Sequence, residues 1–314
     1  MNALPDESRV RFVEGDRLLV VANPATRRDI RRVIAALRAA APAGVDIDVR
    51  ITSRAGEARD LAERYADRAR LVIAVGGDGT VAEVASAVID REAPLAILPG
   101  GSTNIIAREL RIPTRPDEGA ALIFGRHRVR RIDAGYSDRR IFLHMAGGGF
   151  DSRLFARSRP EWKRRVGWLA YLPAAARTLR DKPATVRVTV DGTEVRAMSP
   201  LVLVANGKSV VHPSMKIAHG ISKADGVFDV FIVTAQGPLQ LASVLWQAAR
   251  RNLDRSRFVT RLRGAEVELD AEPALPVQFD GDVDGVTPVR FCVLHGAIRV
   301  VVPEIPAKHL RQDG

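Results

Sequence analysis

The chain has 314 residues, which is comfortable for two domains, and 46% of them are hydrophobic, so a disordered chain is excluded. A single cysteine, Cys292, excludes an internal disulfide framework, and the longest apolar run is about half a transmembrane helix, so we expect a cytoplasmic protein without a secretory signal. The net charge of +11 favours anionic partners such as nucleotide phosphates, acidic lipid headgroups or nucleic acid, although a solvated basic surface accounts for it equally well.

The first 125 residues alternate short β-branched runs with helical patterns. Strands are predicted at 17–23, 46–52, 71–75 and 95–100, and the helices that follow them at 26–41, 56–68, 81–91 and 103–110. Because nearly continuous apolar strands alternate with helices, we expect a mostly parallel sheet that is covered on both faces.

Strand-like alternation dominates after about residue 130 and is interrupted by two helical stretches, 162–181 and 238–251. This pattern predicts an antiparallel β domain with helices laid over it. We therefore divide the chain into an α/β domain at 1–130 and a β-rich domain at 131–296. The tail at 297–314 could by its pattern belong to either domain, and we assign it to the first.

Residues 75–80, VGGDGT, form a glycine-rich turn between a predicted strand and a predicted helix. Backbone N–H groups in such a turn can converge on a phosphate, because no Cβ blocks the approach and the helix N-terminus adds partial positive charge. A Walker A loop is excluded, since the first lysine of the chain is Lys163, and the GxGxxG pattern is not met either. The turn suits a phosphate without matching either common fingerprint.

Asp78 is the charged residue of this turn. A carboxylate beside bound phosphate is repulsive unless a cation intervenes, and Mg²⁺ accepts carboxylate and phosphate oxygens together. The equally open alternative is that Asp78 only shapes its turn, as Asp-Gly pairs often do. Thr80 and Glu83 have the spacing of a capping box, which favours a helix-starting role for Glu83.

Two more loops of small residues are predicted at neighbouring strand ends, ANPATRR at 22–28 and PGGSTN at 99–104. In α/β sheets, loops at the carboxyl ends of strands line the crevice that binds ligands. One such loop is weak evidence, but three at adjacent strand ends predict a phosphate-binding rim.

With these motifs the chain resembles the diacylglycerol kinase catalytic-domain family, which includes soluble bacterial lipid kinases, sphingosine kinases and ceramide kinases. The resemblance covers about residues 18–303, with the motifs in the family's order. They are NP (23–24), GGDGT (76–80), PGGSTN (99–104), GGGFD (147–151), VANG (204–207), MKIA (215–218), DGVFDVFIV (225–233) and FDGD (279–282). Because GGDGT also occurs in NAD kinases, an NAD kinase-like phosphotransferase is the alternative, and the later motifs favour a lipid kinase.

The resemblance implies a Mg²⁺-dependent lipid kinase of phospholipid biosynthesis, which transfers phosphate from ATP to a hydroxyl of diacylglycerol, a sphingoid base or ceramide. It implies an NAD-kinase/phosphofructokinase-like α/β domain and a β-rich antiparallel sandwich domain, with ATP in the cleft between them. Carried over by position, the nucleotide contacts are Asn23, Pro24, Ala25, Thr26, Arg27, Thr52, Gly76, Gly77, Asp78, Gly79, Thr80, Glu83, Gly101, Ser102 and Asn104. The family's structural Mg²⁺ site falls on Asp225, with backbone oxygens of Ser222 and Val227.

The catalytic base is the point at which this sequence departs from the family. The family motif is Asp-Gly-Glu, and here Asp282 follows Gly281. Any carboxylate in reach can accept the proton of a lipid hydroxyl, but aspartate is one methylene shorter, and a displacement of about 1 Å can lower a rate about 100-fold. Asp282 is our candidate base, with Asp78 acting near the nucleotide's magnesium. The alternatives are a solvated acidic turn and a catalytically silent relative that binds lipid or nucleotide.

Two basic stretches are candidates for contact with acidic lipid headgroups. The first, 162–181, combines Trp162, Trp168 and Tyr171 with flanking Lys and Arg, as in helices at a membrane surface, although an ordinary helix over the β domain explains it at least as well. The second, 250–264, could equally be solvated. We expect a lipid substrate and peripheral membrane association, leave a homodimer open, and expect no nucleic-acid partner because no nucleic-acid motif is visible.

Overall fold

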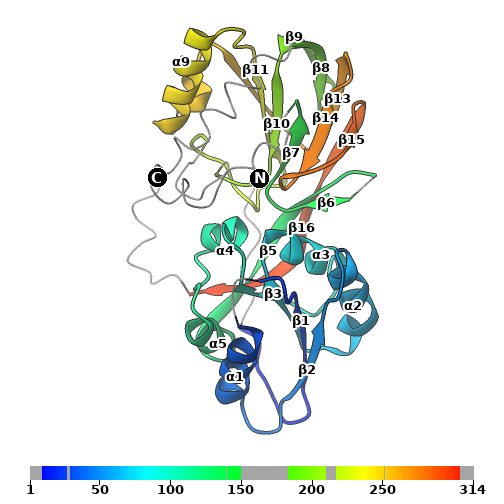
Figure 1. Ribbon diagram of the computed structural model, residues 1–314, viewed down its shortest axis with the longest axis vertical. Coiled ribbons are helices and arrows are strands. Elements are labelled where there is room, and N and C mark those ends of the chain that lie inside the picture. The colour runs from blue at the N-terminus through cyan, green and yellow to red at the C-terminus, as the bar shows by residue number, and fades with distance from the viewer. Residues whose placement is uncertain are drawn as a thin grey trace. The chain divides into compact units, whose positions relative to one another are not determined.

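The computed structural model describes residues 9–26, 29–138, 140–149, 183–209, 217–250 and 252–304 (Figure 1). The chain forms two compact units: unit 1 comprises residues 1–132 and 296–314, and unit 2 comprises residues 133–295. Two strands, β5 (His127–Tyr136) and β16 (Val289–Pro303), each contain a boundary between the units. The helix predicted at 162–181 lies outside the described residues.

Unit 1 is an α/β domain with a parallel sheet. Its strands lie in the order β2 (Asp46–Ile51), β1 (Arg17–Ala22), β3 (Leu71–Gly76), β4 (Leu95–Pro99) and the C-terminal part of β16, and neighbours in this order are parallel. Its helices are α1 (Ile30–Ala40), α2 (Glu57–Tyr65), the short η1 (Ala66–Arg68), α3 (Asp78–Ala87), α4 (Ile105–Glu109) and α5 (Pro116–Phe124). Strands β3 and β4 are buried along their whole length, as expected when both faces of a parallel sheet are covered. The predicted α/β class is confirmed.

The carboxyl ends of these strands are in register. Ala22 pairs with Ile51 of β2 on one side and with Val75 of β3 on the other, and Gly76 pairs with Pro99 of β4. The loops that follow the strands therefore leave the sheet side by side at one edge.

Helix α3 begins at Asp78, three residues before the predicted start at Val81. Gly77 is its N-cap residue, in extended conformation, and no side chain caps the helix there. The glycine turn is therefore shorter than its sequence indicates, because its second half already belongs to the helix. Helix α5 is an element that the sequence analysis does not predict, although Pro116 with two acids in its first turn is typical of a helix start.

Unit 2 consists of two antiparallel sheets. The first contains β9 (Thr193–Ser199), β8 (Ala184–Val190), β13 (Glu266–Glu272) and the N-terminal part of β16. The second contains β12 (Val259–Gly264), β11 (Phe228–Val233), β10 (Leu201–Ala205), β7 (Met145–Gly148), β14 (Pro276–Phe279) and β15 (Asp282–Val286). The short β6 (Ile141–Phe142) pairs with the end of β5, and α9 (Pro238–Ala249) and η3 (Leu253–Arg255) follow β11. Of the helices that the structure describes, none combines the length and apolarity required to cross a bilayer.

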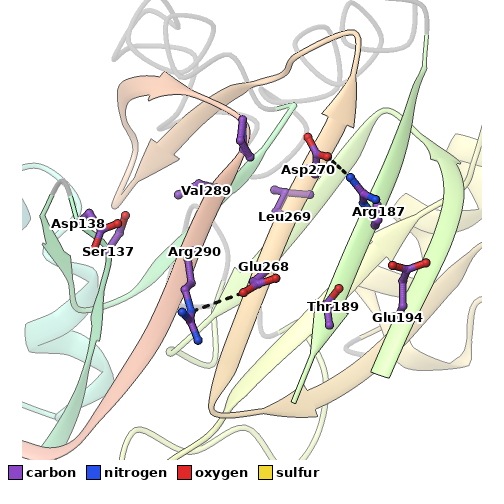
Figure 2. A pocket seen from close by; sticks show the side chains of 11 residues that line it. Ser137, Asp138, Arg187, Thr189, Glu194, Glu268, Leu269, Asp270, Val289 and Arg290 are labelled. Atoms are coloured by element: carbon purple, nitrogen blue, oxygen red, sulfur yellow. Dashed lines mark hydrogen bonds and ion pairs between the residues drawn. The ribbon is translucent and has the colours of Figure 1, made fainter. Parts of the chain in front are cut away.

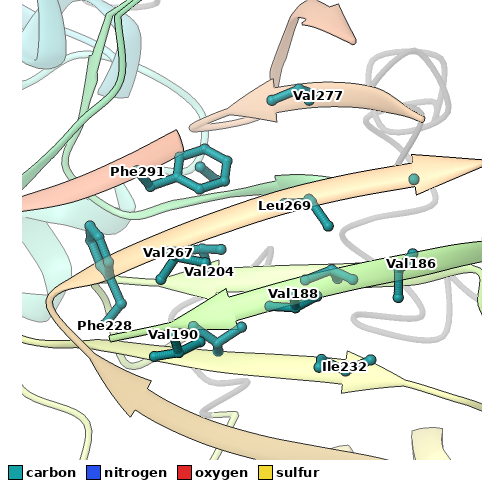
Figure 3. Packing of buried hydrophobic residues seen from close by; sticks show 14 of the residues in the cluster. Val186, Val188, Val190, Val204, Phe228, Ile232, Val267, Leu269, Val277 and Phe291 are labelled. Carbon is teal, nitrogen blue, oxygen red and sulfur yellow. The ribbon is translucent and has the colours of Figure 1, made fainter. Parts of the chain in front are cut away.

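The core of unit 2 lies between its two sheets. Alternate residues of β8, among them Val186 and Val188, are buried, because successive side chains of a strand point to opposite faces. Figure 3 shows them in one cluster with Val204 and Ile232 of the second sheet. Two sheets that bury a shared apolar layer form a sandwich, and the predicted β-rich antiparallel sandwich is confirmed.

Four phenylalanines join the strands of this core. The ring of Phe142 lies 5.5 Å from that of Phe228, 5.9 Å from that of Phe291 and 6.0 Å from that of Phe279, measured between centroids. All four side chains are fully buried, and each such burial contributes about 1.5–3 kcal/mol. The cluster fixes the end of β14, from which Asp280–Asp282 continue.

His127, at the start of β5, is buried in unit 1 and held by two hydrogen bonds. Its Nε2 accepts a hydrogen bond from the N–H of Val10 at 2.9 Å, so Nδ1 carries the proton and donates to the carbonyl of Leu122 at 3.1 Å. Burial lowers the pKa of His127 below its ordinary value, because it disfavours the charged ring. As the pH falls below about 6.5, the unfolded chain takes up a proton before the folded chain does, so stability is lost in this window.

We expect the free energy of unfolding to fall as the pH drops from about 7 toward the lowered pKa of His127, and this part of the slope to be absent in His127→Phe. The variant loses two hydrogen bonds, each of about 1 kcal/mol, so it is also less stable at neutral pH. Urea unfolding at a series of pH values measures both effects. Equal pH slopes in the two proteins would show that another group carries the acid dependence.

Candidate functional site

Four loops gather at the carboxyl edge of the sheet in unit 1. Asn23 follows β1, Thr52 follows β2, Gly77 follows β3 and Gly100 follows β4. This edge is where open α/β sheets bind their ligands. The fold therefore brings most of the predicted nucleotide residues to one edge of one unit.

Asn23 fastens the first loop to helix α3. Its side-chain Nδ2 donates to Oγ1 of Thr80 at 3.1 Å, and its Oδ1 accepts from the N–H of Ala25 at 2.9 Å. Pro24 and Ala25 are exposed, and the N–H of Thr26 donates to the carbonyl of Asn23 at 3.2 Å. Residues 23–26 are thus held by hydrogen bonds within the protein. The predicted contact Arg27 lies outside the described residues.

The glycines of the second and third loops let the two loops touch. A Cβ on Gly101 would lie 2.7 Å from Cα of Gly77, and a Cβ on Gly76 would lie 2.5 Å from Cβ of Thr80. The N–H of Gly100 also donates to the carbonyl of Gly76 at 2.7 Å. These glycines are therefore required by packing within the protein, independently of any phosphate.

Gly79 differs from these neighbours. It lies in the first turn of α3 and is exposed, and a Cβ built on it would meet no atom within 4 Å among the described residues outside its own turn of the helix. Packing gives no reason for a glycine here, and a helix is more stable with alanine at such a position. Close approach of a ligand to the backbone would explain why position 79 is a glycine.

Asn104 shapes the third loop. It adopts a left-handed conformation, with φ 49° and ψ 50°, and its side chain both accepts from the N–H of Gly101 and donates to the carbonyl of Gly101, each at 2.9 Å. Its side chain is buried, whereas Ser102 is exposed at the tip of the loop. Asn104 therefore holds the loop, and Ser102 presents its hydroxyl at the surface.

The acids of this region have separate roles. Oδ1 of Asp78 accepts from the N–H of Ile106 at 3.1 Å and so ties α3 to the start of α4. Glu83 accepts from the N–H groups of Gly56 and Ala58, at 3.1 and 3.2 Å, and so caps helix α2. The predicted capping box of Thr80 and Glu83 is wrong, because α3 already begins at Asp78 and Glu83 accepts hydrogen bonds from helix α2 instead.

Thr52, a predicted nucleotide contact, is buried, and its N–H donates to the carbonyl of Ala22 at 2.9 Å.

Asp280 builds the acidic turn of unit 2. Its carboxylate accepts from three successive backbone N–H groups, those of Leu143, His144 and Met145, at 2.8, 2.8 and 3.0 Å. Its own backbone has a positive φ of 51°, which Asp tolerates better than most residues. The interpretation of this acidic run as a solvated turn is wrong for Asp280, whose role requires a strand that is distant in sequence.

A buried polar network also holds the segment between β6 and β7, at Leu143. Nδ2 of Asn206 donates to the carbonyl of Leu143 at 3.0 Å, and Nζ of Lys223 donates to the same carbonyl at 2.7 Å. Asn206 also donates to the carbonyl of Asp133 at 2.9 Å. These residues are absent from the predicted site, although Asn206 lies in the VANG motif. Together with Asp280 they position the turn that carries Asp282.

Asp282 opens strand β15 and is the exposed acid of this turn. Its side chain is 69% exposed, and its Oδ2 lies 3.7 Å from the guanidinium of Arg140. The N–H of Gly281 donates to Oε1 of Gln278 at 2.8 Å, which fixes the backbone just before it. Asp282 is therefore held on an ordered turn with its carboxylate accessible to a substrate.

Asp225 combines an ion pair with a buried oxygen. Its Oδ2 lies 2.6 Å from Nη2 of Arg263, while its Oδ1 is buried and has no hydrogen-bond partner among the described residues. Burial raises the pKa of Asp225 above its ordinary value, and Arg263 acts in the opposite direction. Within the part of the chain that the structure describes, no group of three or more His, Cys, Asp and Glu could hold a metal ion. A cation at Asp225 would therefore need backbone oxygens, as the resemblance implies for Ser222 and Val227.

A hollow of about 470 Å³ elsewhere on unit 2 lies over β8, β13 and β16. Four of its charged side chains pair with one another, Arg187 with Asp270 at 2.6 Å and Arg290 with Glu268 at 3.7 Å (Figure 2). Such exposed pairs contribute about 0–1 kcal/mol each. None of the predicted site residues lines this hollow, and we assign it no part in the chemistry.

Comparison with known proteins supports the class of protein that these features define, a phosphotransferase of the lipid kinase type. Residues 17–137 match the model of the diacylglycerol kinase catalytic domain, and residues 145–302 match that of the YegS C-terminal NAD kinase beta sandwich-like domain. The chain therefore belongs to the diacylglycerol kinase family of lipid kinases, and the resemblance found from its motifs is confirmed.

Relatives match along almost the whole chain. A diacylglycerol kinase of Bacillus subtilis is 29% identical over 94% of this chain and 99% of its own length. A "probable lipid kinase YegS-like" of Pseudomonas fluorescens is 31% identical over 91% of this chain and 95% of its own. A solved structure described as "a putative diacylglycerol kinase from Bacillus anthracis str. Sterne" superposes with a TM-score of 0.76 at 26% identity, covering 94% of this chain and 99% of that one.

Proposed function

We propose that this protein is an ATP-dependent lipid kinase that phosphorylates a hydroxyl of diacylglycerol or a related lipid, such as a sphingoid base or ceramide. The observation that carries the proposal is the accessible backbone at Gly79. Gly79 is exposed at the start of α3, and no described residue outside its helix turn lies within 4 Å of where its Cβ would be, whereas the neighbouring Gly76 and Gly101 are packed against other residues. Backbone N–H groups at an accessible helix start suit the phosphates of a nucleotide.

The nucleotide is held by unit 1 in this proposal. Asn23 and Asn104 keep the first and third loops in place, Gly79 admits the phosphates, and Ser102 offers a hydroxyl from the exposed loop tip. The triphosphate is polyanionic. Enzymes catalyse phosphoryl transfer almost entirely by positioning the reactants and stabilising their negative charge, rather than by covalent chemistry of the protein.

The base of the proposed reaction is Asp282 on unit 2. The oxygen of the lipid hydroxyl attacks the γ-phosphorus, the bond from that phosphorus to the β–γ bridging oxygen breaks, and ADP leaves. The hydroxyl proton passes to the carboxylate of Asp282. The guanidinium of Arg140 lies 3.7 Å from Oδ2 of Asp282, beside the proposed base. Asp280 acts through Asp282 as a positioning residue.

A divalent cation fits the residues in two places. Asp78 lies at the helix start that would face the phosphates, with Oδ1 already accepting from Ile106. Asp225 has one buried oxygen without a hydrogen-bond partner among the described residues, which a cation would satisfy. When bound, Mg²⁺ neutralises charge on the phosphates or on the buried carboxylate.

We expect Mg²⁺ without nucleotide to raise the melting temperature of the wild type, and Asp225→Asn to lose most of this increase, because a neutral amide does not offset the charge of the cation. Asp270→Asn is the matched control, since it also removes a carboxylate that pairs with an arginine at 2.6 Å. Thermal unfolding with Mg²⁺ and with a chelator measures the difference. An equal Mg²⁺ effect in Asp225→Asn and wild type would rule out Asp225 as a ligand.

The proposed function is tested with labelled ATP over diacylglycerol, sphingoid bases, ceramide and NAD. We expect label in a lipid and none in NADP. Label in NADP alone would make the protein an NAD kinase-like phosphotransferase. Binding of ATP and lipid without transfer would make it a silent relative, an outcome favoured by aspartate at the family's glutamate position.

A further inference from the structure

Helix α9 of unit 2 has no charged residue in its twelve, PLQLASVLWQAA. One side of it is buried. Val244 belongs to an apolar cluster with Phe231 and Leu253, and Ala248 packs against the same cluster. A surface helix of a globular protein normally carries polar or charged residues on its other side. Helix α9 does not.

The other side of α9 exposes large apolar side chains. Leu239 is 86% exposed and Trp246 is 60% exposed. They are seven residues apart, so they lie about 20° from each other around the helix axis, and the exposed Ala242 and Ser243 lie between them. The result is one uncharged stripe along the helix. The position of α9 in unit 2 is seen in Figure 1.

Arginines follow this stripe directly. The guanidinium of Arg250 lies 5.6 Å from the centre of the Trp246 ring, and that of Arg257 lies 4.7 Å from the centre of the Phe258 ring. Arg255 is exposed as well. The acid of this segment, Asp254, lies 3.5 Å from Arg261 and is offset by it. An apolar stripe with a tryptophan and a basic margin is the composition of elements that lie in a membrane interface.

We infer that the outer side of α9 docks on a lipid bilayer, with Leu239 and Trp246 among the headgroups and Arg250, Arg255 and Arg257 against acidic phosphates. Twelve residues of helix span about 18 Å, less than the hydrocarbon thickness of about 30 Å, so the helix lies in the plane of the interface. This inference rests on the proposed function, which requires a substrate that resides in a membrane.

The test is sedimentation of the full-length protein with vesicles of phosphatidylcholine, with and without phosphatidylglycerol. We expect the wild type to bind the acidic vesicles, and Leu239→Ser/Trp246→Ser to bind them at least about tenfold more weakly, since two large apolar side chains are lost from the interface. Arg250→Gln/Arg257→Gln should lose the preference for acidic lipid. Val13→Ser is the matched control, because Val13 is 65% exposed on unit 1. Equal binding of wild type and the α9 double variant would overturn the inference.

A second measurement separates docking from catalysis. With a short-chain diacylglycerol dispersed as monomers, the α9 double variant should keep its rate to within about twofold, while its rate on vesicle substrate falls about as much as its binding. If no lipid is phosphorylated at all, the proposed function fails, yet the vesicle result still decides the role of α9. If the variant changes only a dimer seen by sedimentation velocity and not vesicle binding, the stripe is a contact between two copies and the membrane inference is wrong.

Discussion

Replacing Asp282 with asparagine is expected to lower the rate of phosphate transfer to lipid by about 10²–10⁴-fold, because the amide cannot accept the hydroxyl proton. The stability of the folded protein should not change measurably. The side chain is 69% exposed and pairs with Arg140 at 3.7 Å, its one ion pair among the described residues, and substitutions at such surfaces usually change stability by no more than about 0.5 kcal/mol. The turnover number with saturating ATP and diacylglycerol and the melting temperature measure the two parts of the prediction.

Three further variants make this result specific. Asp282→Glu, unlike Asp282→Asn, keeps a carboxylate at this position. It should therefore retain much of the wild-type activity, since glutamate is the residue of the family motif. Asp138→Asn, an exposed acid of the same unit, should be without effect. Asp280→Asn should lower stability by about 1–3 kcal/mol, because an amide cannot accept all three backbone hydrogen bonds. Full activity of Asp282→Asn would remove Asp282 from the mechanism.

The strand pattern of unit 1 is predictable because it depends on local sequence. The apolar runs at β1, β3 and β4 become buried parallel strands, whereas β2, which alternates Asp with apolar residues, is not buried. Once the strands are parallel and in register, the loops after them must meet at one edge. The common position of Asn23, Gly77 and Gly101 is therefore already implied by the sequence.

The roles of individual acids are not predictable in the same way. Glu83 has the spacing of a capping box with Thr80, but which helix it caps depends on α2 lying beside α3. Asp280 resembles a solvated turn residue until β7 is placed next to β14. In both cases the partner groups are backbone N–H groups distant in sequence, which leave no pattern near the acid.

The exposure of one side of α9 likewise depends on tertiary packing and cannot be predicted from the local sequence. An uncharged helical run indicates burial, and from the sequence alone both sides of it could be covered. The packing of Val244 on one side and the exposure of Leu239 and Trp246 on the other show that only one side of the helix is buried.

Gly79→Ala should weaken ATP binding at least about tenfold and at the same time stabilise the protein. The stability gain is about 0.5–1 kcal/mol, since Gly79 lies in α3 and its added Cβ meets no described residue outside its own helix turn within 4 Å. The binding loss follows if the phosphates approach the backbone at this position, because the methyl group then occupies their space. Titration calorimetry with ATP and thermal unfolding without it measure the two effects.

Opposite signs for binding and stability distinguish a ligand-facing glycine from a packing glycine. Gly101→Ala is the contrast, since its Cβ would lie 2.7 Å from Cα of Gly77 and force the two loops apart. That variant should lose stability and binding together. A more stable Gly79→Ala protein that binds ATP as tightly as the wild type would show that the phosphates lie elsewhere, and the proposed position of the nucleotide would be wrong. Weaker binding in a more stable protein cannot arise from damage to the fold, so it would assign the start of α3 to the ligand.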